Sequence, residues 1–305
     1  MRRGRLPHPG LSPLPPLRSP GARQLRAALA DEELEVHYQP KVELDSERVV
    51  GVEALVRWRH PRRGLIMPAA FLPGLEHHEV MVELSEFVLD SALAQAASWR
   101  RDGAALTVAV NLASASLVDE SLPGAVRAAL TRWGVPPEVL ILEITETAVL
   151  QDPDCAVAVL RELADAGVGV SLDDFGTGES SLSRLLQFPI AELKIDQAFV
   201  RHLALDPGHG GKVVKAVVGL AHDLGHRVVA EGVEDRATLD RLADLHCDQA
   251  QGYYISRPVP AADMPEWARR PRVAADRLFA RPLGSRRGGA LGGAFRNPAV
   301  QYGWC

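Results

Sequence analysis

Several polar residues stand at or near the carboxyl ends of short apolar runs, where buried hydrophobic side chains are the rule. In chain order they are Glu53, Asn111, Glu143, Asp173, Asp174, Lys194, Glu231 and Gln251. Burying an unpaired charge is costly, so each of these acids would need its own partner if it served packing alone. The strand ends supply one lysine for five carboxylates. This excess of acids indicates a common function at one site.

Divalent cations would balance this excess of negative charge. Six of the residues are oxygen donors: Glu53, Asn111, Glu143, Asp173, Asp174 and Glu231. Oxygen ligands select Mg²⁺ or Mn²⁺, also accept Ca²⁺, and disfavour structural zinc. The adjacent acids Asp173 and Asp174 suit two ions, because one carboxylate can bridge while the next binds the second ion. Two ions about 3.5–4 Å apart are typical of phosphodiester hydrolysis.

Lys194 suits the same chemistry. An ammonium group beside two metal ions could orient the attacking water or stabilise charge that develops on the phosphate. The alternative is a lysine that only pairs with a ligand carboxylate, and the sequence leaves it open.

The elements that carry these residues alternate regularly. Leu34 to Tyr38 alternates as a strand, Val49–Leu55 forms a second strand, and Asp45-Ser46-Glu47 is the turn of a predicted hairpin. Further strands are predicted at Thr107–Leu112, Val139–Ile144, Gly169–Leu172, Glu192–Ile195, Arg227–Ala230 and Gln251–Ile255. Helices are predicted at Ser85–Arg101, Leu122–Trp133, Asp154–Ala166 and Gly211–Leu224. Buried strands alternating with helices predict a parallel α/β barrel, whose active site lies where the strands' carboxyl ends converge.

Composition limits the remaining classes of protein. The net charge of -5 over 305 residues argues against a binder of nucleic-acid polymers, which would carry a basic face. No apolar run reaches the roughly 20 residues of a membrane span. Three widely spaced cysteines predict free thiols in a reducing cytoplasm. The Pro/Arg-rich segment 1–21 and the Arg/Gly-rich segment 269–305 are expected to be disordered, which leaves residues 22–268 as the domain.

The motifs, taken together, resemble the EAL domain family of bacterial cyclic di-GMP phosphodiesterases. The triplet Glu53-Ala54-Leu55 alone would be weak support. It is joined in order by Tyr38-Gln39-Pro40, Leu142-Glu143-Ile144-Thr145-Glu146, Asp173-Asp174-Phe175-Gly176-Thr177-Gly178, Leu193-Lys194-Ile195-Asp196, Ala230-Glu231-Gly232 and Gln251-Gly252-Tyr253. The resemblance covers about residues 22–268. It implies a TIM-like (β/α)8 barrel with an antiparallel first strand.

The resemblance also implies roles for individual residues. The first metal ion would be held by Glu53, Asn111, Glu143 and Asp173, the second by Asp173 and Asp174, with Glu231 close by. Lys194 would act on the catalytic water, so Lys194, Glu53 and Glu231 are the expected catalytic residues. Substrate binding is expected at Gln39, Leu55, Arg57 and Gln251. The guanidinium of Arg57 has the fork geometry that suits a phosphate.

The implied reaction is hydrolysis of cyclic di-GMP to linear pGpG with two Mg²⁺ or Mn²⁺ ions, and Ca²⁺ is expected to inhibit. One departure from the family pattern is Glu179, where the loop after Gly178 usually carries tyrosine. Glu146 matches a glutamate that supports this loop. Alternative functions are a receptor that binds cyclic di-GMP without cleaving it, or an enzyme for another phosphodiester. A homodimer in the cytoplasm is expected from the resemblance alone.

Overall fold

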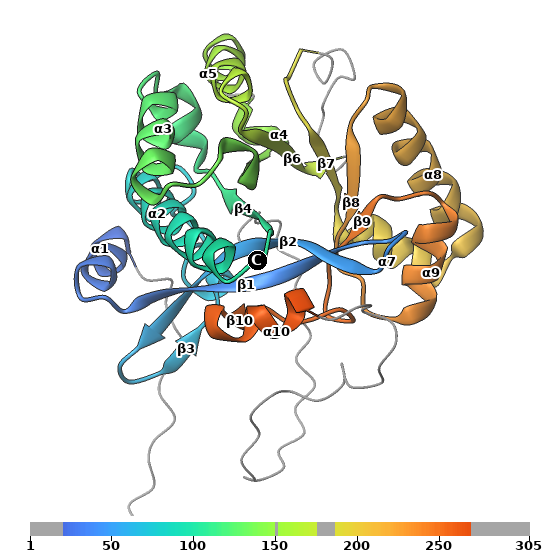
Figure 1. Ribbon diagram of the computed structural model, residues 1–305, viewed down its shortest axis with the longest axis horizontal. Helices are drawn as coiled ribbons and strands as arrows, with labels where there is room; N and C mark the ends of the chain where they lie inside the picture. The colour runs from blue at the N-terminus through green and yellow to red at the C-terminus, as the bar shows by residue number, and fades with distance from the viewer. Residues whose placement is uncertain (1–20, 150–151, 176–186, 270–305) are drawn as a thin grey trace, which may run out of the picture.

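The computed structural model describes residues 21–149, 152–175 and 187–269. Within these residues eight strands close a barrel that helices surround (Figure 1). Around the barrel they follow the order β1 (Leu34–Glu43), β9 (Gln249–Ala250), β8 (Arg227–Ala230), β7 (Glu192–Ile195), β6 (Gly169–Phe175), β5 (Leu140–Thr145), β4 (Thr107–Asn111) and β2 (Arg48–His60). Pairing of β2 with β1 closes the ring. The predicted TIM-like barrel is confirmed.

Strand β1 runs against the others. It pairs antiparallel with both β2 and β9, whereas the remaining neighbours in the barrel are parallel. The hairpin turn lies at the predicted Asp45-Ser46-Glu47, where Glu47 has a φ of 53°. Because β1 is reversed, its early residues lie beside the later residues of β2, and Gln39 pairs with Glu53. Gln39 is therefore nearer the carboxyl ends of the parallel strands than Lys41 is.

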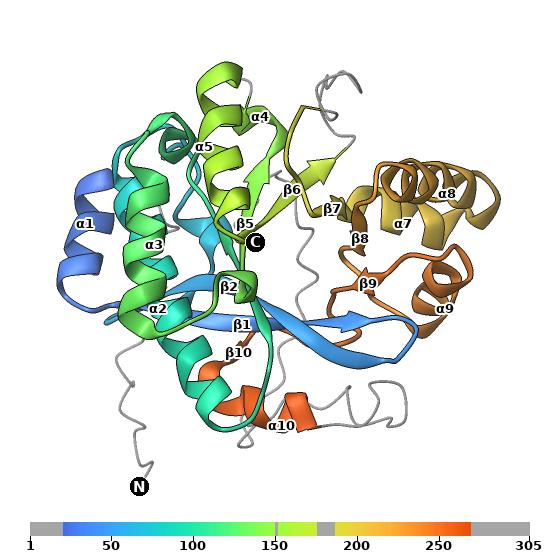
Figure 2. The ribbon, with the colours of Figure 1, turned by 45° about the horizontal axis from the view of Figure 1, so that its top comes forward.

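Helices cover the outside of the barrel, and the two ribbon views show them on opposite sides of it (Figures 1 and 2). They are α1 (Ala22–Ala30), α2 (Val80–Arg101), α3 (Leu122–Trp133), α4 (Glu146–Val149), α5 (Pro153–Asp165), α7 (Gln197–Leu205), α8 (Pro207–Asp223), α9 (Arg236–Asp244) and α10 (Met264–Arg269). Aspartates 152, 196, 206 and 235 cap α5, α7, α8 and α9 by accepting a backbone N–H from the first turn. None of the described helices is both long and apolar enough to cross a bilayer.

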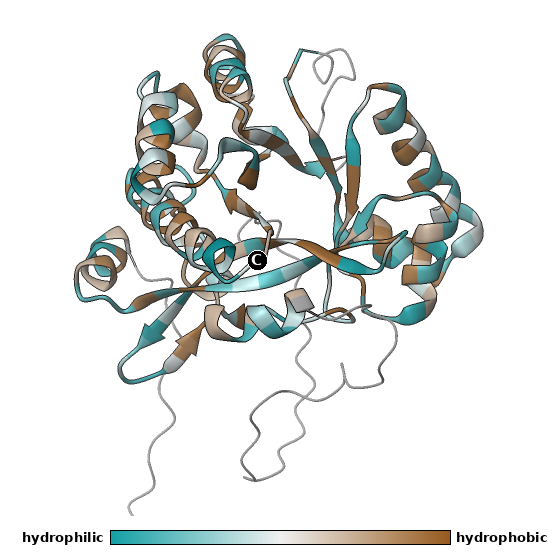
Figure 3. Ribbon diagram, in the orientation of Figure 1, coloured by the Kyte–Doolittle hydropathy of each residue, from teal (hydrophilic) through white to brown (hydrophobic). Residues whose placement is uncertain are grey.

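The hydrophobic core lies between the strands and these helices. Along the helices, hydrophilic and hydrophobic residues alternate (Figure 3). On β4, Val108 and Val110 belong to this core, whereas Ala109 is buried outside it. The same alternation on β5 separates Leu140 and Leu142 from Ile141. Successive side chains of a strand point to opposite faces. Residues of the second series, which continue to Asn111 and Glu143, therefore face the barrel axis.

The last barrel strand differs from the prediction. It is β9 at Gln249–Ala250, and the predicted Gln251–Ile255 is not a strand. Gln251 still donates its backbone N–H to Ala230 O at 2.8 Å, but the chain then turns at Gly252. A Cβ at Gly252 would lie 2.2 Å from Val233 N. This close backbone contact ends the strand where sequence hydrophobicity alone would continue it.

Candidate active site

The predicted residues converge at the carboxyl ends of the strands. The structure places Gln39 on β1, Glu53, Leu55 and Arg57 on β2, Asn111 on β4, Glu143 on β5, Asp173 and Asp174 on β6, Lys194 on β7, Glu231 just after β8 and Gln251 just after β9. Strand register aligns Asn111 with Glu143 and Thr145 with Asp173. Residues up to 212 positions apart are therefore in contact, as the Gln251–Gln39 hydrogen bond shows.

Lys194 lies at the centre of the acids. Its Nζ is 2.6 Å from Glu231 Oε1, 3.0 Å from Glu143 Oε2, 3.2 Å from Asp173 Oδ2 and 3.8 Å from Glu53 Oε2. The lysine is 0% exposed. Burial disfavours its charge, but Asp173, Glu143, Glu231 and Glu53 outweigh that effect and raise the lysine pKa well above its ordinary value. Lys194 is thus a charged ammonium at neutral pH in the middle of the site.

Two amides hold the carboxylate of Glu53. Asn111 Nδ2 donates to Glu53 Oε1 at 2.9 Å, and Gln251 Nε2 donates to Glu53 Oε2 at 2.5 Å. Gln251 also donates to Gln39 Oε1 at 3.0 Å, and Gln39 donates to the Ser256 carbonyl at 2.9 Å. Burial raises the Glu53 pKa, but Lys194 and these amides outweigh it, so the Glu53 pKa is lowered.

The other carboxyl groups have raised pKa values. Burial, followed by the charge of Glu53, raises the pKa of Glu143 to about 8. Burial also raises the pKa values of Asp173 and Glu231, because Lys194 alone does not compensate the loss of solvent. The neighbouring acids oppose one another's ionisation. The site therefore has more negative groups than its lysine can balance.

Asp174 follows Asp173 directly and has an unusual backbone conformation. Its backbone is left-handed, with a φ of 58°, and its N–H donates to Asp173 Oδ1 at 2.9 Å. Burial and then the charge of Asp173 raise the pKa of Asp174 to about 7. A left-handed aspartate is uncommon and tends to occur at functional positions. In a regular strand the side chains of Asp173 and Asp174 would point to opposite faces. The left-handed backbone of Asp174 interrupts that alternation.

The donor set suits hard divalent cations. Its ligating atoms are all oxygens, and Glu143 Oε1 is buried without a hydrogen bond in the described part of the chain. Among residues 21–149, 152–175 and 187–269, no three or more His, Cys, Asp or Glu side chains are already spaced to hold an ion. Instead the carboxylates turn toward Lys194.

Three further predicted residues have distinct environments. Leu55 is 1% exposed yet lies outside the hydrophobic core, which fits a position facing the site. Arg57 is 3% exposed and donates from Nη1 to the Val56 carbonyl at 2.8 Å. Glu146, the first residue of α4, has both carboxylate oxygens buried without a hydrogen bond to any described residue. Residues 176–186, which include Gly176, Gly178 and Glu179, lie outside the described residues.

Two charged residues of the barrel interior were not predicted. Lys41 on β1 and Glu192 on β7 are 0% and 1% exposed, and their side chains are 3.1 Å apart. The sequence identifies candidate lysines only at the carboxyl ends of strands, and Lys194 is the one found there. Lys41 was missed because it lies within β1, which runs antiparallel to the other barrel strands.

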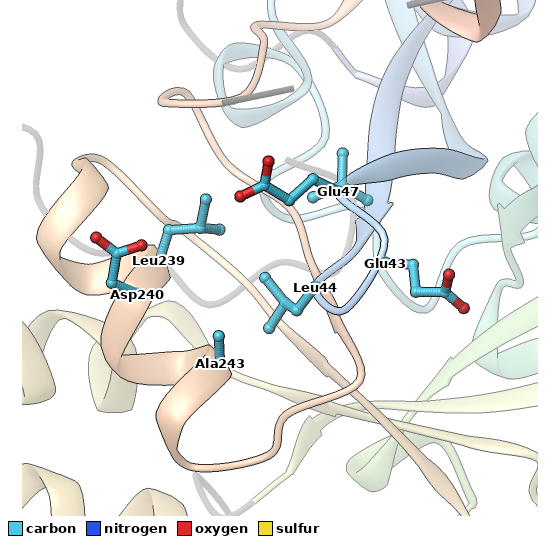
Figure 4. Close-up of a pocket in the computed structure, with 7 residues that line it drawn as sticks. Glu43, Leu44, Glu47, Leu239, Asp240 and Ala243 are labelled. Carbon is cyan, nitrogen blue, oxygen red and sulfur yellow. The ribbon is translucent and has the colours of Figure 1, made fainter. Parts of the chain in front are cut away.

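A pocket at the opposite end of the barrel has a structural role. It lies between the β1–β2 turn and α9, with Leu44 directed toward Leu239 and Ala243 (Figure 4). Two of its acids, Glu47 and Asp240, pair with Arg236 at 3.4 and 2.8 Å. The residues that line the pocket bring the β1–β2 hairpin against α9. None of them is among the acids that converge on Lys194.

Comparison with known proteins identifies the same region. The sequence profile described as the EAL domain matches residues 22–258. The bifunctional diguanylate cyclase/cyclic di-GMP phosphodiesterase MucR of Pseudomonas aeruginosa is 43% identical over 241 residues, which cover 79% of this chain and 35% of MucR. The cyclic di-GMP phosphodiesterase PdeR of Escherichia coli is 37% identical over 246 residues, covering 81% of this chain and 37% of PdeR. The chain thus spans well under half the length of these relatives.

A solved structure resembles the barrel closely. The complex of the MucR phosphodiesterase with c-di-GMP is 43% identical, with a TM-score of 0.75. The match covers 79% of this chain and 98% of the solved chain. The similarity therefore extends over most of this chain and nearly all of the solved one.

Proposed function

This chain belongs to the EAL domain family, and from that membership we propose that it is a metal-dependent phosphodiesterase that hydrolyses cyclic di-GMP to linear pGpG. The observation that carries the proposal is the convergence of Glu53, Glu143, Asp173 and Glu231 on Lys194 at the carboxyl end of the barrel. Buried carboxylates in such excess are suited to two divalent cations and a phosphate. The relatives' names and the c-di-GMP complex of MucR support the choice of substrate.

The proposed ligands divide into two sets that share one aspartate. Glu53, Asn111, Glu143 and Asp173 would hold the first Mg²⁺ or Mn²⁺ ion, and Asp173 with Asp174 the second, with Glu231 adjacent. Bound divalent cations neutralise phosphate charge and lower the pKa of water. The left-handed backbone of Asp174 supports this division, because it lets both neighbouring carboxylates reach one site.

The chain's own residues position the reactants. Lys194 Nζ, released from some of its carboxylates, would donate to the attacking water and to the phosphate oxygens as charge develops. Arg57 would bind a phosphate through its guanidinium, and Gln39, Leu55 and Gln251 would line the nucleotide. Gln251 also orients Glu53 through its 2.5 Å hydrogen bond. Glu146 would support the loop that follows Asp174.

The test is direct. Purified protein is incubated with cyclic di-GMP and Mg²⁺ or Mn²⁺, with EDTA and Ca²⁺ arms, and pGpG is followed by chromatography. We expect product with Mg²⁺ or Mn²⁺, none with EDTA and little with Ca²⁺. Binding without product would favour the receptor function, and faster cleavage of another dinucleotide would favour a different phosphodiester. Sedimentation of the same protein tests the proposed homodimer. Because the proposed substrate is a bacterial second messenger, we expect the protein to act in the cytoplasm.

A further inference from the structure

Two of the four lysines in the sequence lie inside the barrel. Lys194 belongs to the site described above, and Lys41 is equally buried at 0% exposure. Lysine is almost never fully buried unless it is paired. Lys212 and Lys215, by contrast, are exposed on α8. A second buried lysine beside the acids therefore needs a specific explanation.

Lys41 lies one layer below the candidate metal ligands. On β6 and β7 the side chains facing the axis are Ser171 below Asp173 and Glu192 below Lys194, because residues two apart share a face. On the reversed β1, Lys41 lies below Gln39 in the same sense. Strand register aligns Glu143 with Ser171 and Ser171 with Glu192. A row of polar side chains thus supports the site from inside the barrel.

The contacts of this row are specific. Lys41 Nζ donates to Glu192 Oε1 at 3.1 Å, and Ser171 Oγ donates to the same oxygen at 3.2 Å. The described side chains leave Lys41 with one other acid within 4 Å, namely Glu143, whose Oε1 is 3.8 Å away. Glu192 therefore balances the charge of Lys41 and fixes its position.

Glu143 lies between the two lysines. Its Oε2 accepts a hydrogen bond from Lys194 Nζ at 3.0 Å, while its Oε1 faces Lys41. Oε1 accepts no hydrogen bond from any described residue, and the ammonium of Lys41 lies 3.8 Å from it. Because this ion pair attracts Oε1 from below, the carboxylate can keep its orientation when Lys194 releases the other oxygen.

We propose that Lys41 is a positioning residue for the metal site: it holds the carboxylate of Glu143 through Oε1, and Glu192 and Ser171 hold Lys41 in place. This inference rests on the proposed function. Lys41 is not proposed to contact the substrate. Second-layer groups of this kind orient metal ligands, and their loss typically weakens metal affinity about ten- to a hundredfold.

The experiment measures Mn²⁺ binding by calorimetry, without nucleotide, in wild type and in Lys41→Met/Glu192→Met. The double variant removes one positive and one negative charge, so the net charge of the protein is unchanged. A loss of Mn²⁺ affinity therefore reports a change in the orientation of Glu143. Removing both partners also avoids leaving one buried charge unpaired. We expect the Mn²⁺ dissociation constant to rise about ten- to a hundredfold. Lys215→Met, on the surface, is the matched control and should bind as wild type does.

A cooperative thermal transition in EDTA establishes that the double variant is folded. If it is not, Ser171→Ala provides an uncharged test, with an expected rise in the dissociation constant of about twofold to tenfold from the lost hydrogen bond. The inference is overturned if the folded double variant binds Mn²⁺ with wild-type affinity. If the double variant does not fold, the same result with Ser171→Ala overturns it. Failure of the wild type itself to bind Mn²⁺ and to cleave cyclic di-GMP overturns the proposed function instead, and this inference with it.

Discussion

Lys194 on β7 and Glu231 just after β8 approach each other to 2.6 Å between Nζ and Oε1. This ion pair joins neighbouring strands at the carboxyl end of the barrel, and Glu143 and Asp173 contact the same ammonium within 3.2 Å. One cation thus holds together acids from β5, from β6 and from the residue that follows β8. The arrangement makes Lys194 the residue whose loss should affect turnover most directly.

We expect Lys194→Met to lower kcat by about 10²–10³, because it removes the charged donor beside the reacting phosphate. The assay is initial-rate hydrolysis of cyclic di-GMP at saturating Mn²⁺, where bound metal compensates the acids that lose their lysine. Lys212→Met on the surface of α8 serves as the control and should retain wild-type kcat. Undiminished turnover by a folded Lys194→Met protein would remove this lysine from the mechanism.

The thermal stability of the metal-free protein should fall as pH rises from about 5 to about 8. The pKa of Glu143 is raised from 4.5 to about 8 in the folded state, so between these values the folded chain binds more protons than the unfolded one. Stability falls with pH wherever that is so. Asp173, Asp174 and Glu231 act in the same direction, whereas Glu53 and Glu192 have lowered pKa values and stay ionised throughout.

Thermal melts in EDTA at intervals of pH measure this slope, and a Tm that rises over the same range would contradict it. Saturating Mn²⁺ should offset the fall, since metal ions bind the deprotonated acids and their affinity increases with pH. The comparison of the two series isolates the acids of the site from titrating groups elsewhere.

Asp174→Asn should separate stability from activity. Asparagine tolerates the left-handed backbone at φ 58° and removes a carboxyl group whose pKa is raised to about 7 by burial and Asp173. We therefore expect a higher Tm at pH 8 in EDTA and at least a tenfold loss of Mn²⁺-dependent turnover, a magnitude taken from ligand-shell losses. A variant with full activity would place the second metal ion elsewhere.

Gly252→Ala tests the turn that replaces the expected strand. A Cβ there would lie 2.2 Å from Val233 N and 2.3 Å from Val233 O, both backbone atoms that cannot rotate aside. We expect a loss of about 1–3 kcal/mol in the free energy of unfolding, measured with urea. Gly219 on α8 has no atom within 4 Å of its added Cβ, so Gly219→Ala should instead stabilise the helix by about 1 kcal/mol.

Local sequence predicted most of the strands and which polar residues converge at their carboxyl ends. Alternation along the chain identified the runs, and acids such as Glu143 and Asp173 at their ends could be assigned to one face, because parallel strands in a barrel bring their carboxyl ends together. The long helices were predicted as well, with α2 beginning at Val80 rather than Ser85. Helices α7 and α9, of nine residues each, were missed because short segments show few turns of periodicity.

Tertiary structure decided what depends on residues far apart in sequence. Lys41 and Glu192 are separated by 151 positions and meet because β1 is reversed and closes the barrel against β9 and β2. The left-handed Asp174, the turn at Gly252 and the enclosure of Lys194 likewise follow from packing between strands. A strand pattern records which face a side chain occupies, but which partner faces it across the barrel is set by register and closure, and these are properties of the folded chain.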